Sequence, residues 1–213
     1  MIKYLSKTNS NKLTCVAIVR LDFNTEDDWR LRASIPTLEL LLKHSKALVI
    51  LSHKGRPLGF QKQYTLRNDA QKLSQLLNKN VNFIDNFNFD EIRHKIADSI
   101  PKSIFVLENL RFVSMEKGND DSFAKNLASL GDYFVNEAFA VSHRAEASVV
   151  GITKFLPSYA GLGLEKEIKN LSRVMTKPKS PLIMIFGGAK SADKLAVIKY
   201  FRKKAKYFLI GGA

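Results

Sequence analysis

The sequence predicts an α/β protein whose core is a doubly wound parallel sheet in three α/β/α layers, followed by the beginning of a second, similar domain. Short apolar runs alternate with amphipathic helical patterns from one end of the chain to the other, which favours parallel strands joined by helical crossovers. The run at residues 47–51 is apolar throughout, as strands covered on both faces are. Near residue 180 a Pro- and Lys-rich segment is followed by a fresh strand pattern.

The strands of the first, Rossmann-like sheet are predicted from these runs at residues 16–21, 47–51, 81–84, 104–107 and 133–136. The first helix is indicated by Ile35, Leu38 and Leu41, which recur at helical spacing, with Ser34 as a cap and Pro36 in the first turn. Further helices are expected at residues 66–77, 90–100 and 121–129, the last with Gly131 as its C-cap.

The remaining chain divides into a connecting segment and a shorter strand and helix pattern. A charged helix is expected at residues 165–175 after Gly161 and Gly163, and residues 177–181 resemble a linker. A strand, a helix and a strand are then expected at residues 182–186, 192–204 and 207–210. The predicted domains are therefore 1–160, a helix and linker at 161–180, and an incomplete domain at 181–213, because one βαβ unit cannot form its own core.

Composition is typical of a globular protein of 213 residues, 45% of them hydrophobic. The single cysteine, Cys15, excludes an intrachain disulfide and favours a reducing, cytoplasmic location. No apolar run reaches membrane-spanning length, and residues 1–12 lack the apolar segment of a signal peptide. The net charge of +14 is spread along the chain without a nucleic-acid-binding motif, so neither a membrane nor a nucleic-acid partner is expected.

Polar side chains follow four of the predicted strands at the point where each strand ends. They are Asp22 and Asn24, then His53 and Arg56, then Arg111, and finally His143 and Arg144. Carboxyl ends of parallel strands meet at one edge of a sheet, where such folds bind their ligands. Several arginines at one edge repel each other unless an anion neutralises them, so a small molecule with phosphate and carboxylate groups is the expected ligand.

Seven ordered segments resemble the phosphoglycerate kinase family over almost the whole chain. They are VRLDFN at 19–24, RLRASIPT at 30–37, SHKGRP at 52–57, LENLRF at 107–112, VNEAF at 135–139, HRA at 143–145 and GGAKSADK at 187–194. The resemblance implies a reversible phosphoryl transfer between 1,3-bisphosphoglycerate and ADP, giving 3-phosphoglycerate and ATP. It also implies that Mg²⁺ arrives with the nucleotide, that no metal site lies in this chain, and that the protein is a cytoplasmic monomer.

The resemblance further implies a role for each matching residue. Asp22 and Asn24 match the residues that hold the substrate's hydroxyl region, and the basic cluster that grips the phosphate is matched by His53, Arg56, Arg111 and Arg144. Phe23, Lys54 and Gly55 lie in the same segments and are expected to contact the substrate as well. Arg30 matches the arginine that faces the carboxylate and steadies the transferred phosphoryl group. Lys190 and Lys194 match lysines that reach this group and the nucleotide phosphates, beside Gly187 and Gly188.

Several positions depart from the family pattern. The segment at residues 25–29 is shorter than usual, Lys54 replaces an apolar residue, and Glu137, Ala140 and Glu146 stand where Asp, Gly and His are common. An alanine in place of glycine is expected to stiffen or displace the loop that carries Arg144.

The chain also ends before most of the family's nucleotide site, so this chain alone is expected to be inactive. The alternative function is a non-catalytic phosphoglycerate- or anion-binding module derived from the family.

Overall fold

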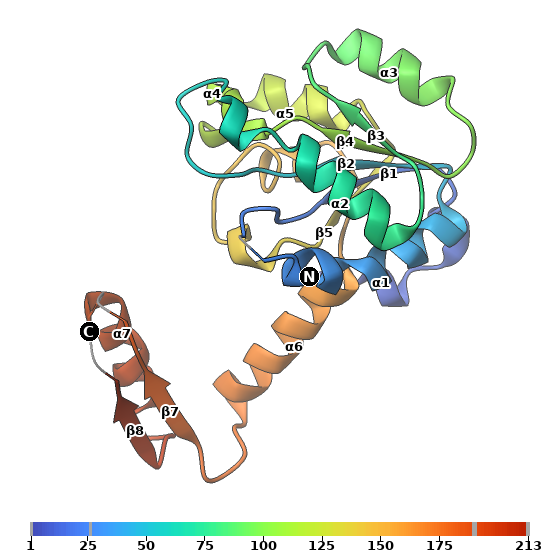
Figure 1. Cartoon of the computed structure of the whole chain (residues 1–213). Coiled ribbons are helices and arrows are strands. Elements are labelled where there is room, and N and C mark those ends of the chain that lie inside the picture. Colours follow the sequence, from blue (N-terminus) through green and yellow to red (C-terminus); the bar gives the residue numbers. More distant parts are fainter. Residues whose placement is uncertain (1, 26, 189–190, 212–213) are drawn as a thin grey trace. The chain divides into compact units, whose positions relative to one another are not determined.

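The computed structural model describes residues 2–25, 27–188 and 191–211, which form two compact units, Met1–Lys166 and Glu167–Ala213. The first unit contains a six-stranded sheet in the order β3-β4-β2-β1-β5-β6 (Figure 1), and every pair of neighbouring strands is parallel. The strands are β1 Val16–Arg20, β2 Ala47–Leu51, β3 Val81–Ile84, β4 Ser103–Leu107, β5 Tyr133–Asn136 and β6 Ser158–Ala160. The predicted parallel α/β fold is confirmed.

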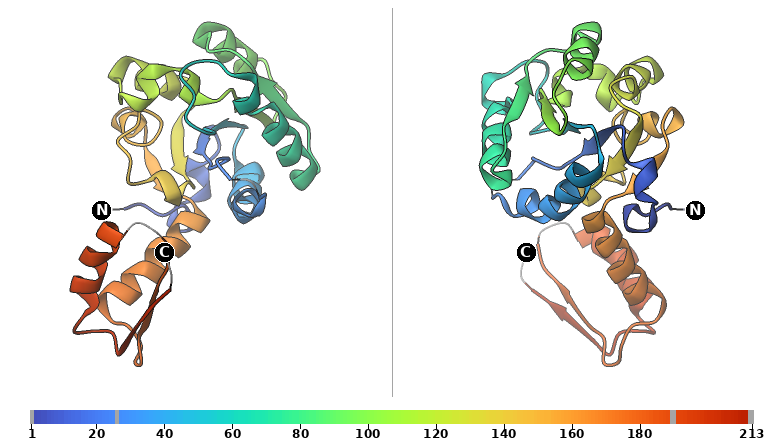
Figure 2. Two further views of the ribbon diagram at one scale, coloured as in Figure 1. Left: turned by 60° about the vertical axis from the view of Figure 1, so that its left-hand side comes forward. Right: turned by 90° about the vertical axis from the view of Figure 1, so that its right-hand side faces the viewer.

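Helices cover both faces of this sheet, as the turned views in Figure 2 show. One core packs α1 (Trp29–His44) and α2 (Arg67–Leu77) against the sheet. A second core, built on the alternate strand residues, packs α3 (Phe89–Ala97) and α5 (Asp121–Ala128) against the other face. Short helical turns complete the loops: Leu5–Lys7, Ser10–Lys12, Lys62–Tyr64, Leu110–Phe112, α4 at Ser114–Lys117, Phe139–Val141 and Gly151–Lys154.

Alternation along β1 decides which side chains reach which core. Ala17 and Val19 lie in the core beneath α1 and α2, whereas Ile18 lies in the core beneath α3 and α5. Because side chains of a strand alternate between faces, Arg20 projects on the same face as Ile18. Arg20 is completely buried, so a charged side chain lies where the pattern of the strand predicts an apolar one.

The first helix begins earlier than predicted. It starts at Trp29 with Asp28 as its N-cap residue, so Ser34 is an interior position and not the cap. The Ser34 hydroxyl instead donates to the Leu31 carbonyl at 2.7 Å within the helix. Pro36 consequently also lies inside the helix, where it lacks the N–H that would bond the carbonyl four residues earlier. The Asp28 carboxylate stabilises the early start by accepting from Arg32 Nε at 2.9 Å.

Gly131 serves close packing and not helix capping. Helix α5 ends at Ala128 with Ser129 as its C-cap residue in a right-handed conformation, and a Cβ on Gly131 would lie 2.9 Å from the Val16 carbonyl oxygen. Helix α3 ends at Ala97, earlier than predicted. The chain then turns into β4 through Lys102, which has a φ of 70°. Strand β6 was not predicted, because three residues are too few to show a periodic pattern.

The second unit contains a two-stranded parallel sheet, β7 (Ile183–Phe186) and β8 (Tyr207–Ile210), with helix α7 (Ser191–Phe201) between the strands. Helix α6 (Leu162–Thr176) precedes them and begins three residues before the predicted start. Much of the strand surface is exposed, with Ile185 at 76% and Ile210 at 78%.

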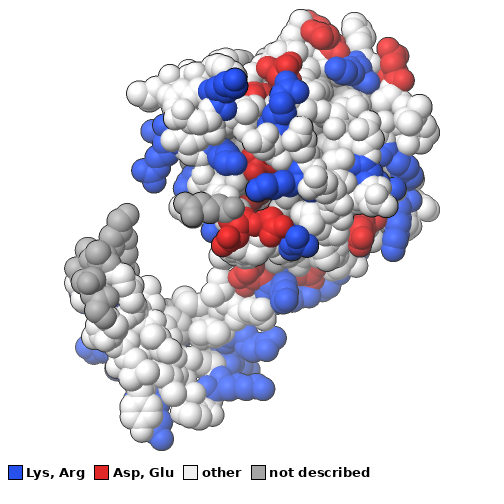
Figure 3. Space-filling model, viewed as in Figure 1, with Lys and Arg blue, Asp and Glu red and all other residues white. Residues whose placement is uncertain are grey.

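Among the described residues, the face drawn in Figure 3 shows no strong segregation of charge. On the face of the larger unit seen in Figure 3, Lys and Arg are interspersed with Asp and Glu. Within the described ranges, none of the helices combines the length and the apolar composition needed to cross a bilayer.

Candidate active site

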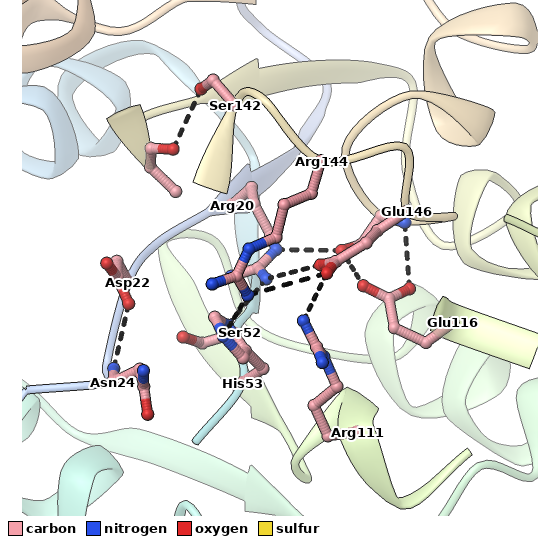
Figure 4. Close-up of polar contacts among 12 residues, drawn as sticks. Arg20, Asp22, Asn24, Ser52, His53, Arg111, Glu116, Ser142, Arg144 and Glu146 are labelled. Carbon is pink, nitrogen blue, oxygen red and sulfur yellow. Dashed lines mark hydrogen bonds and ion pairs between the residues drawn. The ribbon is translucent and has the colours of Figure 1, made fainter. Parts of the chain in front are cut away.

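The loops after β1, β2, β4 and β5 bring polar side chains together at the carboxyl edge of the sheet (Figure 4). Arg20, Arg111 and Arg144 converge there on the carboxylate of Glu146, and His53 lies beside them. These residues are far apart in the sequence, and the parallel sheet is what places them side by side.

Arg20 is the completely buried arginine of this cluster. Its Nε donates to Ser148 Oγ at 2.9 Å, and Ser148 Oγ donates to Glu116 at 2.5 Å. Burial lowers the pKa of the Arg20 guanidinium, while the nearby Glu116 and Glu146 carboxylates oppose that shift. Burial likewise raises the pKa of Glu116, which Arg20 and the bonds from Ser148 counteract.

Sequence reasoning missed the parts that Arg20, Glu116 and Ser148 play in this cluster. The available signal was the arginine itself, at the end of a strand that is otherwise apolar. A buried guanidinium needs a carboxylate and further acceptors nearby, so Arg20 indicates that such partners exist but not which residues they are.

His53 is neutral and holds one defined tautomer. Burial lowers its pKa to about 2, and the positive charges of Arg20, Arg111 and Arg144 contribute. His53 Nδ1 lies 3.0 Å from Nη2 of Arg20, which can only donate, so Nδ1 accepts. Nε2 lies 3.4 Å from Nη1 of Arg144, which also can only donate, and a neutral ring accepts at one nitrogen only. With Nδ1 as the acceptor the ring proton is on Nε2, so the contact with Arg144 is not a hydrogen bond.

Glu146 is the internal counter-ion of the arginine cluster. Arg111 Nη2 donates to Glu146 Oε1, and Arg144 Nη1 lies 3.7 Å from the same oxygen. Nη2 of Arg20 lies 4.0 Å from Glu146 Oε2. The repulsion expected among these arginines is thus relieved in part by a carboxylate of the chain itself.

Asp22, Asn24 and Arg30 form a second polar group along the same edge. Arg30 Nη1 donates to Asp22 Oδ2 at 2.5 Å, and the Arg30 guanidinium also lies over the Trp29 ring. Asn24 Oδ1 accepts from the Gly55 N–H at 2.7 Å and so joins the loops after β1 and β2. Gly55 has a φ of 66° and packs against Tyr64, where a side chain would clash.

The other sequence-predicted residues of the basic loops differ in how exposed they are. Phe23 places its side chain in the core, and its N–H donates to Ser52 Oγ at 3.0 Å. The Lys54 ammonium pairs with Asp69 of α2 at 2.9 Å. Arg56 and His143 are exposed.

A cleft of about 970 Å³ opens beside the cluster. Its charged lining consists of Arg56, Arg111, Lys117, His143, Arg144 and Glu146. Leu58 and Phe112 supply apolar surface on the same cleft. The cleft is large enough to admit a small anionic molecule, and its lining makes positive charge the main attraction.

The candidate nucleotide residues belong to the second unit and follow β7. Gly188 adopts a φ of 89°, which glycine tolerates without strain, and Lys194 Nζ donates to the Gly188 carbonyl. Lys190 lies outside the described residues. Among those described, no three His, Cys, Asp or Glu side chains gather as a metal site would require.

The departures at Glu137 and Ala140 have local structural counterparts. Glu137 Oε1 accepts from Thr37 Oγ1 at 2.9 Å and from the Gly163 N–H at 2.8 Å, at the N-terminal end of α6. A Cβ on Gly161 or Gly163 would collide with this carboxylate, so the two glycines make room for it. Ala140 lies in the turn Phe139–Val141 without a positive φ, so this loop does not depend on glycine at that position.

Glu137 is expected to make stability depend on pH near neutrality. Burial raises the pKa of Glu137 to about 7, against an ordinary value of 4.5, so the folded state binds the proton more tightly than the unfolded state. The protonated Glu137 carboxyl makes its full contribution to stability below about pH 4.5, and this contribution is lost as the pH rises through about 7. Glu137→Gln should therefore match the parent at pH 5 and exceed its unfolding free energy by about 1–3 kcal/mol at pH 8.

Urea unfolding of both proteins between pH 5 and pH 8 measures this difference. His53 acts in the opposite sense: because its pKa is lowered, its contribution to stability decreases as the pH is lowered below about 6.5. Both proteins contain His53, so this contribution cancels in the difference between them. Parallel profiles of the two proteins would contradict the prediction.

Comparison with known proteins relates the chain to one family. The family model described as phosphoglycerate kinase matches residues 15–213. A phosphoglycerate kinase of Coprothermobacter proteolyticus is 43% identical over 205 residues, covering 92% of this chain and 52% of that protein. One of Dictyoglomus turgidum is 41% identical over 202 residues, covering 92% and 51%. The chain thus spans about half the length of the curated relatives it matches.

Solved structures give the same relationship. The phosphoglycerate kinase of Pyrococcus horikoshii superposes with a TM-score of 0.88 at 32% identity, covering 99% of this chain and 55% of that one. The structure from Coxiella burnetii gives a TM-score of 0.82 at 29% identity, covering 100% and 55%.

Proposed function

This chain belongs to the phosphoglycerate kinase family, and we propose that its first unit binds 3-phosphoglycerate and 1,3-bisphosphoglycerate at the carboxyl edge of the sheet. The complete activity would be reversible transfer of a phosphoryl group between 1,3-bisphosphoglycerate and ADP, giving 3-phosphoglycerate and ATP. The observation that carries the proposal is the convergence of Arg56, Arg111 and Arg144, from the loops after β2, β4 and β5, onto one cleft.

The chemistry of these groups suits a phosphate. Arg56 is exposed beside the cleft, and Arg144 is a third exposed, so both can turn toward an anion. His53 lies almost completely buried beside Arg144, and its lowered pKa keeps it uncharged near neutral pH. Guanidinium groups bind phosphate oxygens in pairs, which gives the site both affinity and orientation.

Asp22, Asn24 and Arg30 are proposed to handle the rest of the substrate. Asp22 and Asn24 would bond its hydroxyl region, and Arg30 would leave Asp22 to face the carboxylate and the phosphoryl group in transfer. Transfer of this kind depends on positioning and on neutralising oxygen charges, and the acceptor carboxylate is already ionised, so no side-chain base is required.

The nucleotide is proposed to meet the second unit. Gly187, Gly188 and Lys194 would approach its phosphates, with Lys190 matched to the same role, and Arg30, Lys190 and Lys194 would act on the transferred group. Mg²⁺ would enter with the ATP or ADP. We further propose a monomeric, cytoplasmic protein that uses neither a membrane nor a nucleic acid.

Calorimetric titration of the purified chain with 3-phosphoglycerate, with inorganic phosphate as the comparison ligand, tests the substrate site. Saturable binding that is tighter for 3-phosphoglycerate supports the proposal. Absence of binding to a chain shown by circular dichroism to be folded would refute it.

Arg56→Ala should weaken 3-phosphoglycerate binding by about 1.5–3 kcal/mol, the contribution of a lost charge-assisted hydrogen bond. Arg56 is exposed, so its removal should leave folding intact. Arg93→Ala is the matched control, because Arg93 is partly exposed on α3 and bonds Asp90 and Ser129 away from the cleft. Equal affinity of the Arg56 and Arg93 variants would remove Arg56 from the site.

The alternative function, a non-catalytic anion-binding module, shares this binding site. It differs in predicting that addition of the relatives' remaining half never restores phosphoryl transfer.

A further inference from the structure

Glu146 is unusual among the carboxylates of the larger unit in facing three guanidinium groups while almost completely buried. Only 4% of its surface is exposed, and its partners are Arg20, Arg111 and Arg144. Its Oε2 atom is buried and accepts no hydrogen bond from the described residues. The carboxylate is therefore held in place mainly by positive charge.

The same guanidinium groups are the ones that a ligand phosphate needs. Arg111 and Arg144 line the cleft, and both have Glu146 Oε1 as their nearest carboxylate oxygen. Arg20 has a second carboxylate, Glu116, connected through Ser148, so it does not depend on Glu146 alone. An incoming anion therefore competes with Glu146 for the N–H donors of Arg111 and Arg144.

We propose that Glu146 is an internal competitor of the substrate phosphate. It occupies Arg111 and Arg144 while the cleft is free of ligand, keeps the cluster from repelling itself, and lowers the affinity of the site for phosphate groups. This inference rests on the proposed function for the identity of the ligand. Its own content is that a chain carboxylate sets how tightly the arginine cluster binds any phosphate.

Two effects follow from the competition. A phosphate that binds must displace Arg111 or Arg144 from Glu146, or bind beside a negative charge, and either event opposes binding. Loss of the Glu146 charge should therefore strengthen anion binding while weakening the anion-free protein. These opposite changes distinguish a competing anion from a residue that only maintains the shape of the cleft.

Glu146→Gln provides the direct test, because the amide keeps an oxygen that can accept from Arg111 and removes only the charge. Calorimetry with inorganic phosphate and with 3-phosphoglycerate should give affinities about tenfold or more higher than those of the parent, as expected for an unopposed charge-assisted contact. The melting temperature in chloride should fall, and phosphate should raise it more than it raises that of the parent.

The matched control is Asp121→Asn. Asp121 lies on α5 and forms an exposed ion pair with Lys154, so this variant loses the same charge away from the cluster. Its phosphate affinity should equal that of the parent, which separates a local effect from a change in net charge. If Glu146→Gln is insoluble, Glu146→Asp decides the question, because the shorter acid withdraws from Arg111 and should still strengthen phosphate binding.

The outcomes separate this inference from the proposed function. If the parent binds 3-phosphoglycerate and the soluble Glu146 variant binds it equally or more weakly, Glu146 is not a competitor and the substrate site stands. If neither the parent nor the variant binds either ligand, the substrate site itself is refuted. Tighter binding by the variant together with unchanged binding by Asp121→Asn supports both.

Discussion

Replacement of Arg20 by Met is expected to cost about 3–5 kcal/mol of unfolding free energy, the range for breaking a buried ion pair by removing one partner. Methionine keeps an unbranched apolar stem like that of arginine but lacks the guanidinium, so the change removes the charge, the donors and the volume of that group. Glu116 and Glu146 would then lose their completely buried counter-ion, and Ser148 Oγ and His53 Nδ1 would lose the donor of their hydrogen bonds.

Urea unfolding at pH 7 measures the effect, with Arg93→Met as the control at a partly exposed arginine of α3, where a change within about 0.5 kcal/mol is expected. A second substitution, Glu116→Gln in the Arg20→Met background, should recover part of the loss because it removes one stranded charge. A cost below about 1 kcal/mol for Arg20→Met would mean that the carboxylates do not depend on this guanidinium.

The chain on its own is expected to give no phosphoryl transfer above the rate without protein, even while it binds 3-phosphoglycerate. Its matched relatives are about twice as long, and transfer requires both substrates to be enclosed in fixed geometry. The second unit also leaves Leu209 and Ile210 at least half exposed on its two-stranded sheet.

A coupled assay with 3-phosphoglycerate, ATP and Mg²⁺ measures this, beside a full-length relative as the positive control. A Lys194→Ala variant controls for a contaminating kinase. Activity that persists in the preparation of this variant is attributed to the contaminant and not to the chain. Turnover that depends on both Lys194 and Arg30 would show that transfer does not require the half of the relatives' length that this chain does not match.

The fold was predictable because burial in a parallel sheet leaves a clear signal in the sequence. The run at residues 47–51 and the helical spacing of Leu38 and Leu41 each follow from packing against one hydrophobic core. Helix starts were less predictable, since Ser34 and Pro36 favour a later start, whereas α1 begins at Trp29 after Asp28, whose side chain caps no backbone N–H. A glycine after a helix favours a C-cap in the sequence, but the role of Gly131 comes from its close approach to the Val16 carbonyl, which depends on tertiary packing.

The candidate site was predictable as a set of residue types, but its internal pairing was not. Residues after parallel strands were expected to share an edge, and Arg111, Arg144 and His53 do. The same argument expected an external anion to neutralise them, whereas Glu146 does so in part. The direction of a side chain such as Lys54, which turns to Asp69, depends on contacts that no spacing encodes.

The alternation of β1 has a consequence for how this gene can change. Ala17 and Val19 face one core, whereas Ile18 and Arg20 face the other, so substitutions in β1 act on one core at a time. Loss of a single codon within the strand would exchange every following side chain between the faces. It would drive the Arg20 charge into the layer of α1 and α2, where its carboxylates do not lie. Evolution can therefore vary the composition of this strand more freely than its length.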